Sequence, residues 1–215
     1  MRPTVADTRT AILDAAEREF AVHGAENASL RDIAQRAGQR NNSAVQYHFG
    51  DRDGLVAAVF SRSMDRINLD RIERLAAIGD DATVPELVGT LLVPLIDHVE
   101  RTNGWYGRFL ARNRFDRIAR DVRGGLPATV VVRDITRRLD ERLVGMPRRV
   151  RNMRLESVIN HYTAALASWE WARDRGEIRP SADELREELM ATCTAIFLAP
   201  PIVSGSRTPK KEKSR

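Results

Sequence analysis

Apolar residues recur along most of this chain at the spacing of an α-helix. In several segments they stand at positions i, i+3, i+4 and i+7, which places them on one face of a helix. A β-branched run begins at Val130, but its apolar positions continue with helical spacing, so no β-sheet is predicted. The helical series are Leu30, Ile33, Ala34 and Ala37; Leu155, Val158, Ile159, Tyr162, Leu166 and Trp169; and Leu185, Leu189, Cys193 and Ile196.

Local signals indicate where these helices begin and end. Ser29, Thr83 and Ser181 each stand three residues before an acidic residue, which is the spacing of a capping box that satisfies free N–H groups in a first turn. Glycines end several of the periodic segments. The pattern predicts an all-α protein of about nine helices, at residues 6–23, 29–37, 42–49, 52–78, 84–101, 105–121, 127–143, 148–175 and 182–199.

The lengths of these helices predict two domains and a tail. The first three are short, with the geometry of a helix-turn-helix, and predict a DNA-binding domain over residues 1–52. The longer helices predict a larger helical body over residues 53–203. The helix at 52–78 would be about 40 Å long at 1.5 Å per residue and would connect the two domains. Residues 204–215 are polar and basic, which predicts a disordered tail.

The composition is that of an ordinary globular protein, and we expect it in the cytoplasm. Hydrophobic residues make up 42% of the chain and charged residues 30%. No run approaches the roughly 18 apolar residues of a membrane helix, and the first residues lack the apolar stretch of a secretory signal. The single cysteine, Cys193, cannot form an internal disulfide, which fits a reducing compartment.

The net charge of +5 does not by itself identify a DNA-binding region. Residues 207–215 carry five basic residues and one acid, whereas residues 1–62 carry eight arginines and eight acids. The basic tail could add non-specific affinity for DNA, although a solvated end is the simpler interpretation. A prediction of DNA binding must therefore rest on the local arrangement of side chains.

The sequence contains no catalytic or cofactor-binding motif. All three lysines lie in the tail, so the body has none for a Walker-type phosphate loop or a Schiff base. No Gly-x-Ser-x-Gly elbow or dinucleotide fingerprint is present, and the four histidines lack the spacing of metal ligands. We therefore expect no enzymatic activity, no cofactor and no metal.

The predicted helix at 42–49 has the character of a helix that reads DNA. Val45 and Phe49, four residues apart, would face the core and leave polar side chains outward. Asn and Gln can bond bidentately to adenine and Arg to guanine, while Tyr and His can reach phosphate oxygens. The alternative is a polar surface helix without a nucleic-acid partner. The candidates for contact with double-stranded DNA are Ser29, Arg40, Asn41, Asn42, Ser43, Gln46, Tyr47, His48 and Arg52.

Residues 8–60 resemble the DNA-binding domain of the TetR family of bacterial transcriptional regulators. The resemblance runs through "TRTAILDAAEREFAVHGAENASLRDIAQRAG" and "YHFGDRDGLVAAVF". It implies an operator-binding homodimer, usually a repressor that a small molecule releases. It also implies that the body at residues 53–203 is an effector-binding and dimerisation domain. It also implies that Ser29, Tyr47, His48 and Arg52 contact DNA.

The chain departs from the family pattern in the turn before the third helix. Between Gly38 and Tyr47 it has eight residues, where the common pattern has seven. We expect the turn to absorb the extra residue, so that Arg40 and Asn41 still reach the major groove.

The candidates for ligand binding follow a helix that contains a proline. Pro94 removes one backbone donor and should kink the helix at 84–101, leaving space beside it. The segment "GWYGRFLARNRF" comes next and could form an apolar pocket with a few polar anchors. The alternative is that these aromatic residues only pack in the core, and the same alternative applies to His161 and Tyr162. The candidates for binding an unknown small-molecule effector are Trp105, Tyr106, Phe109, Arg112, Asn113, His161 and Tyr162.

The last two helices predict a homodimer. Residues 148–175 and 182–199 are apolar along one side, and Trp169, Trp171 and Phe197 would leave hydrophobic surface on a monomer. A two-fold four-helix interface would bury that surface and match palindromic half-sites.

The leading hypothesis is a ligand-responsive repressor. Ligand binding between the helices at 84–101 and 148–175 would tilt the helix at 52–78 and change the separation of the two reading helices. The alternatives are a protein–protein interaction protein that keeps the helix-turn-helix as a scaffold, and a regulator without a small-molecule effector.

Overall fold

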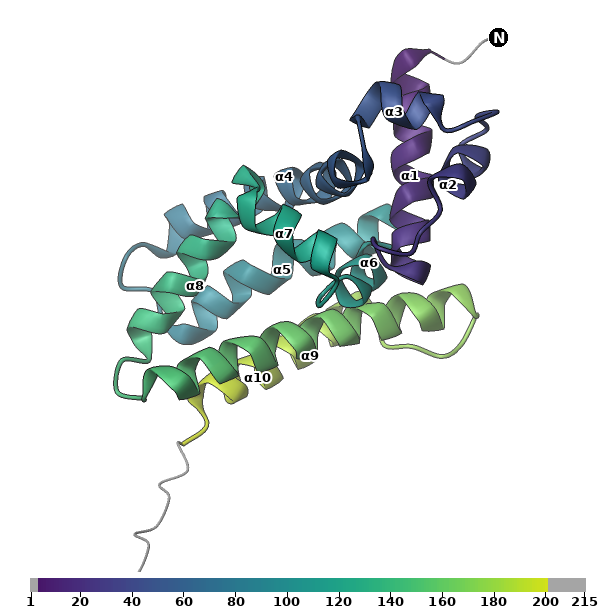
Figure 1. Cartoon of the computed structure of the whole chain (residues 1–215). Coiled ribbons are helices and arrows are strands. Elements are labelled where there is room, and N and C mark those ends of the chain that lie inside the picture. Colours follow the sequence, from purple (N-terminus) through teal and green to yellow (C-terminus); the bar gives the residue numbers. More distant parts are fainter. Residues whose placement is uncertain (1–3, 201–215) are drawn as a thin grey trace, which may run out of the picture.

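The described part of the chain is entirely helical (Figure 1). The computed structural model describes residues 4–200, in which there are ten α-helices and no strand. This confirms the predicted all-α fold, while the tail predicted at 204–215 lies outside the described residues. The elements are α1 (Val5–His23), α2 (Leu30–Arg36), α3 (Ser43–Phe49), α4 (Arg52–Ile78), α5 (Val84–Thr102), α6 (Tyr106–Arg112), α7 (Arg117–Gly125), the 3-10 helix η1 (Pro127–Thr129), α8 (Val130–Arg142), α9 (Arg148–Asp174) and α10 (Ala182–Leu198).

Capping side chains begin the helices where the sequence predicts them. Thr83 and Ser181 form full capping boxes, each with the glutamate three residues later. The Ser29 hydroxyl accepts a hydrogen bond from the backbone N–H of Asp32 at 3.2 Å, so α2 is capped as well. Thr4 forms a further capping box, which was not predicted, at the start of α1. These bonds satisfy N–H groups that have no partner within the first turn of a helix.

The prediction of one helix at 105–121 is wrong, because α6 and α7 are separate helices joined by a turn. The side chain of Asn113, just after α6, points into the core and bonds to α1, and Asp116 is the N-cap of α7. Asp116 accepts a hydrogen bond from the N–H of Ala119 at 3.0 Å, so a new helix begins there. In the helix predicted at 127–143, the first three residues form η1 instead of an α-helical turn.

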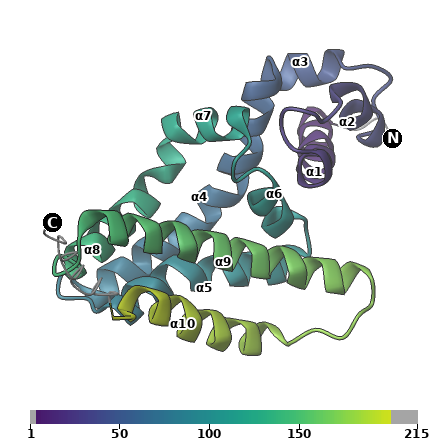
Figure 2. The ribbon, with the colours of Figure 1, turned by 60° about the horizontal axis from the view of Figure 1, so that its bottom comes forward.

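The first three helices form a group of their own, and the last two form one side of the body (Figures 1 and 2). α1, α2 and α3 gather at one end, and α9 and α10 run side by side along the body until α9 reaches below α1 in Figure 1. α4 has 27 residues and therefore extends about 40 Å, from the end of α3 into the body, where it packs on α5 and α7. It connects the N-terminal helices to the body, as the sequence predicts.

The prediction that three aromatic residues leave an apolar surface near the C-terminus is wrong for two of them. Trp169 is 7% exposed and Phe197 is 1% exposed, while Trp171 is 52% exposed. The indole N–H of Trp169 donates to the carbonyl oxygen of Pro180 at 2.8 Å, which satisfies its polar atom inside the core. The exposed residues of α9 and α10 are mostly small or polar. They include His161, Ala164, Ser168, Ala191 and Ala195.

Two buried carboxylates hold the start of α6. Glu17 of α1 accepts a hydrogen bond from the backbone N–H of Trp105 at 2.9 Å. Glu170 of α9 accepts bonds from the N–H groups of Gly107 at 2.8 Å and Arg108 at 2.9 Å. A helix N-terminus offers unpaired N–H groups and a positive dipole end, so both carboxylates are well placed there. α6 is consequently tied to the N-terminal helices on one side and to α9 on the other.

The end of α6 is tied to α1 by an asparagine. Asn113 is fully buried, and its Oδ1 accepts from the backbone N–H of Ala25 at 2.7 Å. Its Nδ2 donates to the carbonyl oxygens of Phe20 at 3.0 Å and Phe109 at 2.8 Å. Two of these three bonds, those with Ala25 and Phe20, cross from the end of α6 to the end of α1 and so fix the position of one helix relative to the other.

Glu170→Ala is expected to lower the free energy of unfolding by about 3 kcal/mol, because a buried charge-bearing network loses its acceptor. Burial raises the pKa of Glu170 to about 7, an effect opposed by its two backbone N–H donors and by the Arg108 guanidinium. Glu170→Gln keeps one acceptor oxygen and should lose less. Urea denaturation measures both, and Glu187→Ala, at an exposed position of α10, is the control. Equal stability of Glu170→Ala and Glu187→Ala would show that Glu170 does not hold the start of α6.

Candidate DNA-binding face and ligand cavity

A glycine-dependent turn joins α2 to α3. The N–H of Gly38 donates to the carbonyl of Gln35 at 3.0 Å, and the N–H of Gln39 donates to that of Ala34 at 2.9 Å. These two bonds form a Schellman motif, whose central residue requires the positive φ of +72° that Gly38 adopts. α3 begins at Ser43, so residues 37–42 form the turn between the two helices.

The inner side of α3 packs as predicted. Val45 is fully buried, and Phe49 is partly buried against the core. The guanidinium carbon of Arg9 lies 5.3 Å from the centre of the Phe49 ring, a cation–π contact that binds the start of α1 to the end of α3. Arg9 was not among the predicted residues, because nothing in its local sequence shows that α1 passes beside α3.

The outer side of α3 and the turn before it present most of the predicted DNA-contacting residues to solvent. Tyr47 is 80% exposed, and its ring meets the partly buried His48 ring edge to face at a centroid distance of 5.1 Å. The Oδ1 of Asn41 accepts from the backbone N–H of Ser43 at 3.0 Å, so this side chain bonds to the first residue of α3. The exposed members of the predicted set are Arg40, Asn41, Asn42, Ser43, Gln46 and Tyr47.

The structure gives Arg52 a packing role that the sequence did not indicate. Its Nη1 donates to the carbonyl oxygens of Ala25 at 2.7 Å and Ala28 at 2.6 Å. These bonds fasten the first turn of α4 to the loop that enters α2, where Ser29 is the N-cap. Arg52 therefore fixes the orientation of α2 relative to α4.

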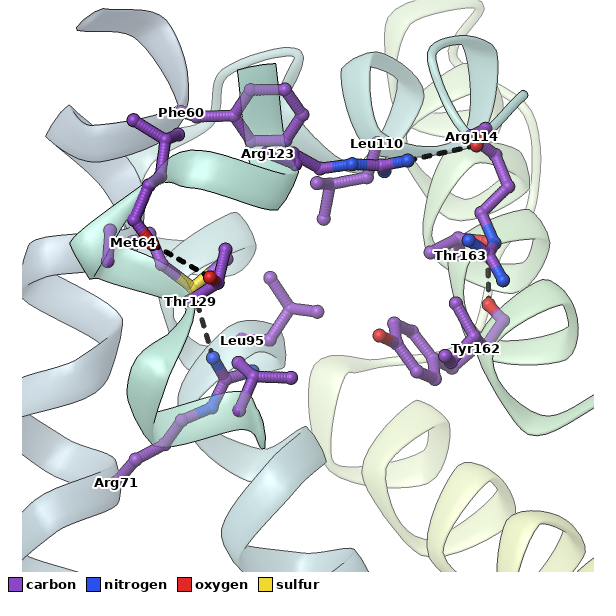
Figure 3. Close-up of a pocket in the computed structure, with 14 residues that line it drawn as sticks. Phe60, Met64, Arg71, Leu95, Leu110, Arg114, Arg123, Thr129, Tyr162 and Thr163 are labelled. Atoms are coloured by element: carbon purple, nitrogen blue, oxygen red, sulfur yellow. Dashed lines mark hydrogen bonds between the residues drawn. The ribbon is translucent and has the colours of Figure 1, made fainter. Parts of the chain in front are cut away.

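A cavity of about 150 Å³ lies in the body (Figure 3). Residues of α4, α5, α6, α7, α8 and α9 surround it, and most of them are apolar. Figure 3 shows Arg71 extending into it from α4 and Tyr162 from the opposite wall. The lining residues are Phe60, Met64, Arg71, Leu95, Leu110, Arg114, Arg123, Leu126, Ala128, Thr129, Val132, Ile159, Tyr162 and Thr163.

Of the residues predicted to bind a ligand, only Tyr162 lines this cavity. Tyr106 and Phe109 are buried in the core, and the Phe109 ring lies 4.6 Å from that of Phe60, which does line the cavity. Arg112 and His161 are exposed. The other two residues hold α6 in place. Asn113 bonds to the end of α1, and the backbone N–H of Trp105 bonds to Glu17 of α1. The guanidinium carbon of Arg108 also lies 3.4 Å from the centre of the Trp105 ring. The segment after Pro94 thus packs behind the residues that line the cavity. Periodicity alone could not distinguish the lining residues from those behind them.

Burial governs the ionisation of the polar groups around the cavity. It raises the pKa of Tyr106 and Tyr162, so both remain neutral hydroxyls, and it lowers the pKa of Arg71 and Arg123. A guanidinium nevertheless stays charged in proteins. The Tyr106 hydroxyl has no hydrogen-bond partner among the described residues.

Neither a metal site nor a membrane span is found between residues 4 and 200. No group of three or more His, Cys, Asp or Glu side chains in this range is arranged to hold a metal ion. None of the helices described is both long and apolar enough to cross a bilayer.

Comparison with known proteins identifies the N-terminal helices. Residues 12–59 match the family model of bacterial regulatory proteins, tetR family, which confirms the resemblance seen in the sequence. No curated protein matches the chain.

Solved structures share the fold of most of the chain. A structure assigned to the tetR family of transcription regulators, from Shewanella sp. PV-4, is 14% identical, with a TM-score of 0.60, over 88% of this chain and 95% of that one. The fatty acid degradation regulator FadR from Bacillus halodurans is 15% identical, with a TM-score of 0.56, over 89% and 99% of the two chains. At these identities the two structures show a shared fold and nothing further.

Arg52→Ala is expected to lower the free energy of unfolding by about 1–3 kcal/mol, because two carbonyl oxygens lose a charged donor. Arg40→Ala is the matched control, since Arg40 is exposed in the turn and should change stability little. Chemical denaturation followed by circular dichroism measures both. An Arg52→Ala protein as stable as the Arg40→Ala protein would show that the two bonds contribute nothing.

Proposed function

We propose that this chain, which has the tetR-family DNA-binding domain at its N-terminus and a tetR-like fold throughout, is a DNA-binding transcriptional regulator that recognises an operator sequence through α3. The observation that carries the proposal is the outer side of α3 and its turn, where several exposed side chains offer paired donors and acceptors. Below that face, Val45 and Phe49 hold the helix on its domain. We expect this regulator in the cytoplasm, without enzymatic activity.

The exposed groups match the chemistry of a major groove. The amides of Asn42 and Gln46 can bond to adenine, and the guanidinium of Arg40 can bond to guanine. Tyr47 and His48, at the end of α3, and the N-terminus of α2 at Ser29 suit phosphate oxygens, which position the helix without reading sequence. Since residues 1–62 carry no net charge, binding must depend on these local groups more than on a basic surface.

A dimer through α9 and α10 would present two such helices to a palindromic site. Several exposed residues there are small, among them Ala164, Ala191 and Ala195, and small side chains let helices approach closely. The Nε2 of His161 lies 2.8 Å from the Thr192 hydroxyl, a bond that joins α9 to α10 at the surface. Ala164 and Ala195 each follow one member of this pair by three residues and so lie on the same face of their helices.

The cavity in the body is the proposed effector site, and α6 is the proposed link to DNA. Leu110 and Arg114 line the cavity, while Asn113 between them bonds to Phe20 in the last turn of α1 and to Ala25 just after it. A ligand that displaces Leu110 or Arg114 would thereby move α1 and change the separation of the two α3 helices. Repression would be relieved to the extent that the ligand prefers the displaced state.

Gln46→Ala is expected to weaken operator binding by about 1–3 kcal/mol, roughly 5- to 150-fold, because one base loses its bidentate partner. The thermal midpoint should not change, since Gln46 is exposed. Fluorescence anisotropy at fixed salt, with a duplex recovered from randomised DNA, measures the affinity.

Asn152→Ala removes an exposed amide from α9 instead and serves as the control for Gln46→Ala. It should bind the same duplex like the wild type. Equal affinity of wild type, Gln46→Ala and Asn152→Ala would remove Gln46 from the reading set. Loss of affinity in both variants would mean that the assay does not report contact with bases.

Ala195→Arg is expected to convert the dimer into a folded monomer, because two like charges would meet across the two-fold axis. Ala76→Arg places the same charge on an exposed position of α4 and should leave the dimer intact. Light scattering gives the mass, and circular dichroism checks the fold. A wild-type monomer at micromolar concentration, or a dimer that Ala195→Arg does not disturb, would contradict this interface.

A further inference from the structure

The cavity in the body is cationic as well as apolar. Three arginines line it, Arg71, Arg114 and Arg123, and no Asp or Glu is among its lining residues. The three come from different elements, α4, the turn after α6, and α7. Figure 3 shows Arg71 on one side of the space and the other two on the side above Tyr162. A cavity that only completed the packing of the core would not need three guanidinium groups.

Arg71 is buried without an acidic partner. It is 2% exposed, and none of the ion pairs among residues 4–200 includes it. Its Nε and Nη2 donate to one carbonyl oxygen, that of Leu91, at 3.2 and 2.7 Å. Burying a charge in this way is costly unless an opposite charge compensates it. An anion in the cavity would supply that compensation.

The remaining amino group of Arg71 has weak partners that a ligand can replace. Nη1 donates to the thioether sulfur of Met64 at 3.1 Å and to the Oδ1 of Asn68 at 3.3 Å. A thioether is a poor acceptor, and Met64 lines the cavity on a flexible side chain. A carboxylate oxygen at this position would form a charge-assisted bond of about twice the strength of a neutral one.

The arginines on the other side differ in their availability. Arg114 forms an ion pair with the exposed Glu156, so its charge is balanced within the chain. Arg123 donates to the carbonyl oxygen of Arg114 at 3.0 Å, and it is found in no ion pair within the described range. Its charge adds to the positive potential of the cavity.

The rest of the cavity sets the size and polarity of the ligand. Its volume of about 150 Å³ suits a small organic molecule. Leu95, Leu110 and Ile159 provide apolar walls. In Figure 3 the hydroxyl of Tyr162 points toward the side from which Arg71 extends, where it can donate to the same acceptor.

We propose that the effector of this cavity is a small organic carboxylate, bound by the Nη1 of Arg71 and the hydroxyl of Tyr162 with its aromatic or short aliphatic body against the apolar walls. The proposal rests on the proposed function only in treating the cavity as the effector site. Carboxylate binding itself needs no DNA. Displacement of Met64 by the carboxylate would also release the side chain of a residue in the middle of α4.

The test is isothermal titration calorimetry on the full-length protein with matched probes. Benzoate is compared with benzamide and benzylamine, and hexanoate with hexanamide. The wild type should bind each carboxylate at least about tenfold more tightly than its amide, the lower end expected for a hydrogen bond to a charged group. Arg71→Gln should abolish this preference while retaining the weak apolar binding of the amide. Arg149→Gln, at an exposed position of α9, should behave like the wild type.

Amides or the amine binding as well as the carboxylates would overturn the proposal, as would no binding of either carboxylate. An Arg71→Gln protein that kept the full preference would overturn the assignment to Arg71. If Arg71→Gln fails to fold, Arg123→Gln replaces it and should reduce the preference at least severalfold. Operator binding is measured separately, so carboxylate binding by a protein that ignores DNA would refute the proposed function alone.

Discussion

The structure depends on how the start of α6 is held by two buried carboxylates. Glu17 and Glu170 come from α1 and α9, helices far apart in the sequence, and both accept bonds from the first N–H groups of the same short helix. A helix of seven residues has little stability of its own, so its position is decided by these contacts. The N-terminal helices are therefore not joined to the body by α4 alone. They are fastened through α6 as well.

This double attachment gives a physical basis for communication within the chain. A hinge at α4 only would let the N-terminal helices rotate independently of the cavity. With Asn113 bonded to α1 and its neighbour Arg114 lining the cavity, a displacement in one region must be accommodated in the other. Packed interiors respond to such displacements by switching between discrete arrangements more readily than by continuous deformation. Under the proposed function, the turn between α6 and α7 is the element that would change when an effector binds.

The sequence was most informative where a single local signal decides the structure. Capping residues, glycines and apolar periods predicted most helix ends, and the pairing of Val45 with Phe49 predicted the outward face of α3. It failed where a polar residue serves a distant partner. Asn113 and Asp116 break a helix that periodicity continues, and Arg52 bonds to a loop more than twenty residues earlier. The cavity was located only approximately, since the segment after Pro94 packs behind its wall and Arg71 resembles any other arginine of a long helix.

The central claim is that α3 reads a base sequence, and selection from randomised duplexes followed by sequencing tests it most directly. The account predicts enrichment of an inverted repeat whose half-sites lie on one face of the duplex, because two copies of α3 would engage it together. Recovered DNA with no sequence preference over the starting pool would contradict the account, even if the protein bound DNA.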